Sequence, residues 1–242
     1  MKITINEKTY EAKEGQTVLE VAKENGIYIP SLCYDAKIGG LSRCRACVVE
    51  IEGRSGLQTS CSTPATEGMA VTTNSRKVLE AQKLVVEFLL SAGIHNCADC
   101  PRYEDCALKE AAHYLGIELD MTGPVLTSSL VSWFEAPYWN EAHGLSLGDP
   151  GRTYLDISLH LDDSDQFIQV ARDKCILCGL CIEACHIAGR DVIHFSHRGH
   201  RTQIIFDNDV PLGESRCDHC RECLKVCPTA ALVQKQPGKN PF

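Results

Sequence analysis

The spacing of the cysteines constrains this chain more than any other feature of its sequence. The 242 residues include fifteen cysteines, an odd number, and several of them stand as C-x2-C pairs. An odd count and repeated C-x2-C spacing argue against a disulfide framework and indicate metal binding. Every cysteine falls into one of three groups with the spacing of iron–sulfur ligands, whose thiolates hold the iron. The groups are Cys33, Cys44, Cys47 and Cys61; Cys97, Cys100 and Cys106; and Cys175, Cys178, Cys181, Cys185, Cys217, Cys220, Cys223 and Cys227.

The last group consists of two runs with the spacing C-x2-C-x2-C-x3-C, the motif of bacterial ferredoxins with two [4Fe–4S] clusters. In that motif the fourth cysteine of each run binds the cluster of the other run. We therefore expect one cluster on Cys175, Cys178, Cys181 and Cys227, and the other on Cys217, Cys220, Cys223 and Cys185. Pro228 follows Cys227 as the motif requires, whereas His186 follows Cys185.

Between the two runs, residues 192–209 alternate as a β-hairpin and contain three histidines. Both ferredoxin sites already have four thiolates. We therefore expect His194, His197 and His200 on the solvated surface rather than among the ligands.

The first group of cysteines is embedded in a pattern of short strands and one helix. Residues 2–12 alternate as two strands around a turn at residues 6–7. A helix is predicted from residue 17 to the glycine at 26, and a further strand over residues 48–52. The cysteines lie in the loops between these elements.

The spacing of this group, C-x10-C-x2-C-x13-C, differs from the C-x4-C-x2-C…C spacing of plant ferredoxins. It resembles the N-terminal ferredoxin-like domain of the large iron–sulfur subunit of respiratory complex I. Iron-only hydrogenases and the small diaphorase subunits of NAD-linked hydrogenases share that domain. The resemblance implies a β-grasp fold with a [2Fe–2S] cluster on Cys33, Cys44, Cys47 and Cys61. Gly39 and Gly40 would let backbone N–H groups approach the sulfurs. The alternative is a structural zinc site, although zinc ligands usually come as two close pairs.

The middle group supplies three thiolates, one fewer than a [4Fe–4S] cluster needs. Its members are Cys97, Cys100 and Cys106. They lie between predicted helices over residues 76–92 and 107–115, and His95 is the nearest candidate for the fourth ligand. The same resemblance implies a cluster held by one histidine and three cysteines here. In complex I and iron-only hydrogenases that histidine lies four residues before the first cysteine, where this chain has Gly93. The H-N-C form resembles the small diaphorase subunits. The alternative is that His95 only packs or caps, and His113 is a poor substitute.

These groups divide the chain into four parts and indicate an α+β protein. The expected parts are a [2Fe–2S] ferredoxin-like domain at 1–78, a histidine-plus-three-cysteine [4Fe–4S] domain at 79–120, a connecting segment at 121–165 and a double [4Fe–4S] ferredoxin domain at 166–235. The connecting segment holds four aromatic residues, Trp133, Phe134, Tyr138 and Trp139. It either packs against its flanking domains or docks a partner subunit, since aromatic residues are enriched at interface cores.

The charge and the apolar pattern of the sequence limit the kinds of partner and the cellular location that we expect. The formal net charge is −8, which disfavours nucleic acid because its recognition needs a basic face. The first ten residues lack the apolar core of a signal peptide. No run of about 18 apolar residues is present to span a membrane. Because thiols must stay reduced until iron binds, we expect a cytoplasmic protein.

The role of the chain is indicated by what it contains and what it lacks. It has no G-x-G-x-x-G or P-loop fingerprint for a nucleotide, and no cysteine remains to hold a nickel–iron centre. The resemblance implies a non-catalytic electron-transfer subunit with one [2Fe–2S] and three [4Fe–4S] clusters. Its partners would be a flavoprotein subunit that oxidises NAD(P)H and the catalytic and small subunits of a nickel–iron hydrogenase. Eight intact ferredoxin cysteines would also suit reduction of external ferredoxin, as in electron bifurcation. The alternatives are the equivalent subunit of an NAD-linked formate dehydrogenase and a zinc-held structural scaffold.

Overall fold

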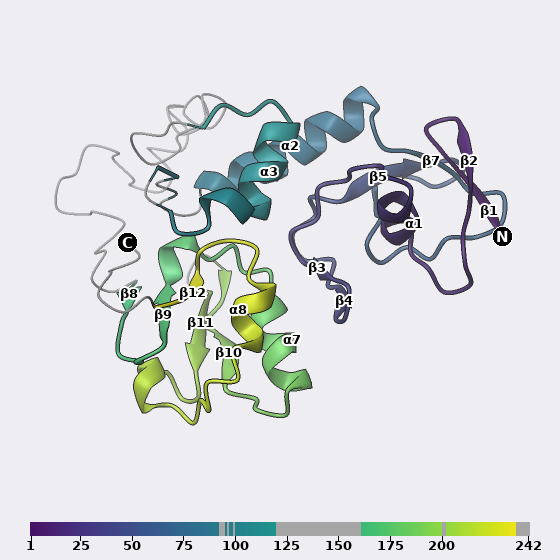
Figure 1. Ribbon diagram of the computed structural model, residues 1–242. Coiled ribbons are helices and arrows are strands. Elements are labelled where there is room, and N and C mark those ends of the chain that lie inside the picture. The colour runs from purple at the N-terminus through teal and green to yellow at the C-terminus, as the bar shows by residue number, and fades with distance from the viewer. Residues whose placement is uncertain (92–94, 96, 99, 120–160, 200–201, 236–242) are drawn as a thin grey trace.

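The computed structural model describes residues 1–91, 95, 97–98, 100–119, 161–199 and 202–235, and these form three parts (Figure 1). The N-terminal part is a sheet with a helix, the middle part is a helix pair, and the C-terminal part has small sheets and two helices. Gly93, His200 and the aromatic residues from Trp133 to Trp139 lie outside the described residues. Within the described ranges, no helix is long and apolar enough to cross a bilayer.

A five-stranded mixed sheet forms the N-terminal part. In spatial order its strands are β2 Lys8–Glu11, β1 Lys2–Ile5, β7 Ala70–Thr72, β5 Val48–Ile51 and β6 Gln58–Thr59. β1 pairs parallel with β7, and the other pairs are antiparallel. Asn6 and Glu7, between β1 and β2, have φ of 48° and 69°. Positive φ at both central residues is what a type I′ hairpin turn requires, so the predicted hairpin is confirmed.

Helix α1, Val18–Glu24, packs its apolar face into the core of this sheet. The Thr17 hydroxyl accepts a hydrogen bond from the Glu20 N–H, and the Glu20 carboxylate accepts one from the Thr17 N–H. Such an N-cap contributes about 1 kcal/mol. Gly26, with φ of 71°, follows the helix, as the sequence predicts.

Helices α2, Arg76–Ser91, and α3, Ala107–Tyr114, form the middle part and contact each other. Before α2, the Ser75 hydroxyl accepts a hydrogen bond from the Val78 N–H at 3.2 Å. After α3, Gly116 has a left-handed φ of 64°. Both helices form where the apolar period of the sequence predicts them.

The C-terminal part combines a three-stranded antiparallel sheet, a hairpin and two helices that contact each other. The sheet has the order β12 Leu232–Gln234, β9 Ile168–Ala171 and β8 Leu161–Asp162; the hairpin is β10 Ile193–Ser196 with β11 Gln203–Phe206; and the helices are α7 Leu180–Ile187 and α8 Glu222–Val226. Short 3-10 turns lie at Tyr103–Asp105, Arg172–Lys174 and Leu212–Glu214. Strand β8 falls within the expected connecting segment, yet it pairs with β9.

One apolar core joins all three parts. Leu32 from the N-terminal part, Leu90 and Leu108 from the helix pair and Leu180 from α7 belong to a single cluster of buried side chains. A short hairpin of β3, Tyr34–Asp35, and β4, Gly39–Gly40, lies between the N-terminal sheet and α8 (Figure 1). The packing therefore fixes how the three parts are placed relative to one another.

Candidate metal centres

Four thiols converge beside the N-terminal sheet. Cys33 lies just before β3, Cys44 and Cys47 lie on the loop that leads into β5, and Cys61 follows β6. All four are at most 8% exposed. The Cys44 N–H donates to the Cys33 Sγ at 3.4 Å, and the Ser42 Oγ lies 3.7 Å from the Cys61 Sγ. The structure thus brings the four residues of the predicted [2Fe–2S] site together.

These thiols hydrogen-bond to one another, which sets their protonation. The Cys44 and Cys61 thiols donate to Cys33 and lower the pKa of Cys33 to about 2. The Cys61 thiol lowers the pKa of Cys47 to about 7 in the same way. The same hydrogen bonds, together with burial, raise the pKa of Cys44 and of Cys61. Four thiols cannot all ionise in so small a space unless positive charge offsets their repulsion. Iron bound to the sulfurs would offset part of it, so the donor set fits a binuclear cluster.

The β3–β4 hairpin closes against this site at Gly40. A Cβ on Gly40 would lie 2.3 Å from the Cys61 carbonyl oxygen and 2.7 Å from the Cys61 Cβ, so only glycine fits. Gly39 instead has a left-handed φ of 85°, with no atom within 4 Å of an added Cβ. On the same loop Ser42 and Arg45 are also left-handed, with φ of 54° and 60°. Such conformations can direct successive N–H groups toward an anion.

Three further thiols lie before and at the start of α3. Cys97 and Cys100 share a turn in which the Cys100 N–H donates to the Cys97 carbonyl at 3.3 Å, and Cys106 directly precedes α3. Burial raises the pKa of Cys97 and of Cys106, and neighbouring thiolates add to the rise. The N–H groups of Leu108 and Lys109 oppose it at Cys106, because a helix N-terminus favours a thiolate. Iron would take the place of the protons that burial retains.

His95 is buried, with 9% of its surface exposed. Burial and, next, the charge of Lys174 lower the pKa of its imidazole, so the ring is neutral at pH 7, the form that binds metals. The ring also hydrogen-bonds to the Leu89 backbone carbonyl, and ligating histidines usually donate their second ring N–H in this way. No described contact joins the ring to the three thiols, so ligation by His95 stays a prediction. His113 is exposed on α3.

The two ferredoxin runs follow the same backbone path. Leu177 and Gly179 in the first run have φ of 53° and 84°, and His219 and Arg221 at the corresponding places in the second run have 61° and 63°. A left-handed conformation costs an L-residue such as leucine about 1–2 kcal/mol. Both runs adopt it despite this cost. Backbone nests formed in this way bind anions, which fits a cluster with four thiolate ligands.

The fourth cysteine of each run lies beside the other run. Cys185 lies within α7, and Cys227 lies at the C-terminal end of α8. Burial raises the pKa of Cys175 to about 11 and that of Cys178 to about 12, and the charge of Cys227 adds to both shifts. Burial and the neighbouring thiolates, Cys185 among them, raise the pKa of Cys223 to about 12. These placements favour the crossed ligand sets.

A cavity with mainly apolar walls marks the second ferredoxin site. Its lining consists of the four cysteines of one predicted set, Cys185, Cys217, Cys220 and Cys223, the apolar residues Ile168, Val192, Ile193, Phe206, Leu212 and Leu232, and the charged residues Arg190, Asp218 and Arg221. The Val192 N–H donates to the Cys185 Sγ at 3.3 Å. Four thiols around one apolar cavity, with a backbone donor, fit a [4Fe–4S] cluster.

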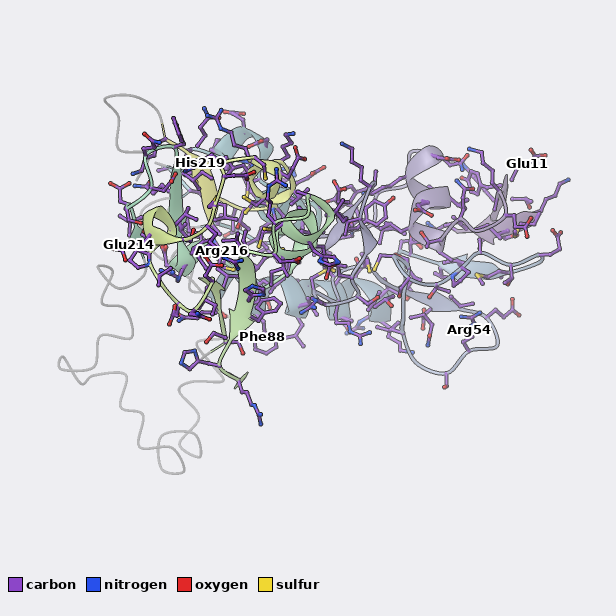
Figure 2. All side chains as sticks on the ribbon, turned by 90° about the horizontal axis from the view of Figure 1, so that it is seen from below. Glu11, Arg54, Phe88, Glu214, Arg216 and His219 are labelled. Atoms are coloured by element: carbon purple, nitrogen blue, oxygen red, sulfur yellow. The ribbon has the colours of Figure 1, made fainter. Side chains whose placement is uncertain are left out.

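The first ferredoxin site is near the N-terminal thiols, and the second lies toward the far end of the molecule. Cys33 and Cys178 belong to the same central core, and the charge of Cys33 contributes to the raised pKa of Cys178. His219, within the second run, lies at the end of the molecule opposite Glu11 and Arg54 (Figure 2). The predicted sites therefore extend from the central core toward the end of the molecule that carries His219.

Several smaller predictions can be compared with the structure. His194 and His197 are exposed, as expected. All fifteen cysteines lie in the described ranges and are free thiols. Among the described residues, no group of three or more His, Cys, Asp or Glu side chains is placed as the ligands of a single metal ion. Arg43 and Lys174 were not singled out from the sequence. Each directly precedes a predicted ligand cysteine, Cys44 and Cys175, and this position next to a ligand could have identified them.

Three family models match successive parts of the chain. The model of the 2Fe-2S iron-sulfur cluster binding domain matches residues 1–76. That of the NADH-ubiquinone oxidoreductase-G iron-sulfur binding region matches residues 82–119. That of the 4Fe-4S dicluster domain matches residues 174–231. The matches confirm iron–sulfur domains in the expected order within a mixed α/β protein.

Similar proteins match nearly the whole chain. The NADP-reducing hydrogenase subunit HndD of Solidesulfovibrio fructosivorans is 34% identical over 98% of this chain, which spans 36% of that subunit. A putative formate dehydrogenase of Staphylococcus aureus is 28% identical over 96% of the chain, which spans 20% of it. A chain in the crystal structure of an NAD+-reducing [NiFe]-hydrogenase in the H2-reduced state has a TM-score of 0.76 and 28% identity, with 98% of this chain and 88% of that one covered.

One relative matches over most of its own length as well. The gamma subunit of the NAD-reducing hydrogenase HoxS of Cupriavidus necator is 30% identical over 98% of this chain and 88% of that subunit. Its match extends over 98% of this chain, which carries all three iron–sulfur domain matches. This chain belongs to the family of the NAD-reducing hydrogenase gamma subunit.

Proposed function

We propose that this chain is the electron-transfer subunit of a multisubunit NAD(P)-linked hydrogenase. It would carry electrons between a flavoprotein subunit that oxidises NAD(P)H and a nickel–iron hydrogenase module. Membership of the HoxS gamma family and the similarity to an NAD+-reducing [NiFe]-hydrogenase chain support this proposal. Bound iron–sulfur clusters would supply the one-electron chemistry, and the protein would supply ligands, placement and electrostatics.

The observation that carries the proposal is the apolar core shared by three of the predicted sites. Cys33 and Cys44 of the first site and Cys178 of the ferredoxin domain lie within it, and Cys106 of the middle site packs against it. A close-packed interior excludes water and holds its parts at fixed separations. Electron tunnelling weakens steeply with distance, so a rigid shared core is what an electron-transfer chain needs.

The proposed ligand sets are those expected from the cysteine spacing and from the family resemblance, and the convergence of the four N-terminal thiols supports the first of them. They are Cys33, Cys44, Cys47 and Cys61 for a [2Fe–2S] cluster, and His95, Cys97, Cys100 and Cys106; Cys175, Cys178, Cys181 and Cys227; and Cys217, Cys220, Cys223 and Cys185 for three [4Fe–4S] clusters. We also propose that the N-terminal sheet and α1 form a β-grasp fold, which the strand order β2-β1-β7-β5-β6 supports.

Separate observations support exchange with external ferredoxin, a second candidate function and a location for the protein. Cys217 and Cys220 are only partly buried in the second run, so this site is our proposed point of exchange with external ferredoxin. The match to a putative formate dehydrogenase favours an NAD-linked formate dehydrogenase as the second candidate. We propose the cytoplasm as the location, because thiols that await iron need a reducing compartment.

Anaerobically purified protein should contain about fourteen iron atoms per chain, two from a binuclear cluster and four from each of three tetranuclear ones. Iron and acid-labile sulfide would be assayed chemically, and Mössbauer spectroscopy would divide the iron between the two cluster types. About eight irons per chain would contradict the four-cluster proposal. Stoichiometric zinc would instead support the scaffold alternative.

A further inference from the structure

Arg43 reaches from the first predicted cluster site to the ferredoxin domain. It directly precedes Cys44, and its backbone N–H and that of Cys44 both donate to the Cys33 sulfur. The backbone of Arg43 is therefore part of the N-terminal site. The side chain extends away from that site, toward the C-terminal part of the chain.

The Arg43 guanidinium contacts two elements of the ferredoxin domain. Its Cζ lies 4.9 Å from the centroid of the Phe195 ring on β10, in a cation–π contact. Its Nε lies 3.1 Å from the position that a Cβ on Gly179 would occupy. Gly179 has a left-handed φ of 84° and separates Cys178 from the start of α7. A Cβ at Gly179 would make a tight contact with the Arg43 side chain, so the glycine gives the guanidinium room beside the Cys178–Cys181 loop.

The Arg43 guanidinium places one positive charge near two predicted cluster sites, the N-terminal site and the first ferredoxin site. Arginine carries a delocalised positive charge, and its planar guanidinium stacks on aromatic rings. A positive charge near a cluster favours the reduced form, which carries one more negative charge. Arg43 is exposed, so salt screens part of this effect.

We propose that Arg43 is a positioning residue that clamps the Cys44 loop against the Cys178–Cys181 loop and raises the reduction potentials of both clusters. The inference rests on the proposed function, because it needs the first two ligand sets to hold iron. In this proposal the Arg43 side chain joins the loops that carry the two predicted cluster sites.

The test is a potentiometric titration of the full chain at low ionic strength, monitored by EPR. Wild-type protein comes first: if it lacks the clusters, the proposed function fails, and this inference fails with it. Arg43→Gln should then lower the potentials of both the [2Fe–2S] cluster and the Cys175/Cys178/Cys181 cluster. Arg45→Gln is the matched control, because it removes one charge from the other side of Cys44 and has no described contact with the ferredoxin domain. It should lower only the [2Fe–2S] potential.

A second variant separates the clamp from the charge. Phe195→Leu keeps every charge but removes the ring, so it should lower the potential of the ferredoxin cluster and leave the [2Fe–2S] cluster near its wild-type value. If Arg43→Gln does not take up its clusters, Phe195→Leu decides the matter alone. The inference is overturned if Arg43→Gln shifts only the [2Fe–2S] potential, as Arg45→Gln does. It is equally overturned if Phe195→Leu shifts neither cluster.

Discussion

Gly40→Ala is expected to abolish the [2Fe–2S] cluster while the three [4Fe–4S] clusters remain. The added Cβ would lie 2.3 Å from the Cys61 carbonyl oxygen, a separation that real Cβ atoms do not show. Either the β3–β4 hairpin or the backbone that carries Cys61 must then move, and overpacking of this kind typically costs about 1–3 kcal/mol. The measurement is the amplitude of the binuclear EPR signal in the reduced protein, with total iron falling to about twelve per chain.

Gly39→Ala is the matched control for this experiment. Gly39 pairs with Asp35 on the same hairpin, and its left-handed φ of 85° would strain an alanine by about 1–2 kcal/mol. Nothing lies within 4 Å of the added Cβ, so the hairpin should be less stable but keep its cluster. Equal loss of the signal in both variants would mean that hairpin stability, and not the approach to Cys61, controls cluster binding.

His95→Ala is expected to remove the fourth ligand of the middle cluster, and His95→Cys to keep that cluster at a lower potential. Neutral imidazole leaves a cluster less negative than a thiolate does, so the added negative charge disfavours reduction. EPR-monitored redox titration of the reduced protein measures both effects. His113→Ala is the control, because His113 is exposed on α3 and should change neither the spectrum nor the potential.

An unchanged spectrum and potential in both His95 variants would show that the ligand lies elsewhere in the chain. Loss of the cluster in His95→Ala together with an unchanged potential in His95→Cys would show a structural role for the buried ring. The hydrogen bond from the ring to the Leu89 carbonyl would then be the interaction that matters.

Local elements of the fold could be predicted from the sequence because short-range signals determine them. The hairpin turn at Asn6 and Glu7, the capping of α1 by Thr17 and the end of α3 near Gly116 all depend on neighbouring residues. The apolar period likewise placed α2, Arg76–Ser91, correctly. In each case the residues that specify the element lie within a few positions of one another.

Long-range contacts could not be predicted in this way. The parallel pairing of β1 with β7 and the pairing of β8 with β9 join segments whose own sequences do not name their partners. The contact of Gly40 with Cys61 and that of Arg43 with Phe195 also depend on how separate parts pack. Cysteine spacing identified the ligand candidates, but their grouping around a shared core is visible only in three dimensions.

Reduction of the clusters by each substrate, in the isolated chain and in the purified complex, decides whether this chain passes electrons between its partner subunits. EPR spectra would be recorded after NAD(P)H alone or hydrogen alone is added under anaerobic conditions. Either substrate should reduce the clusters of this chain within the complex, and neither should reduce them in the isolated chain. Reduction by formate in place of hydrogen would favour the second candidate function. Reduction of the isolated chain by NAD(P)H without a flavoprotein, or clusters that no substrate reduces in an active complex, would rule out the proposed electron-transfer role.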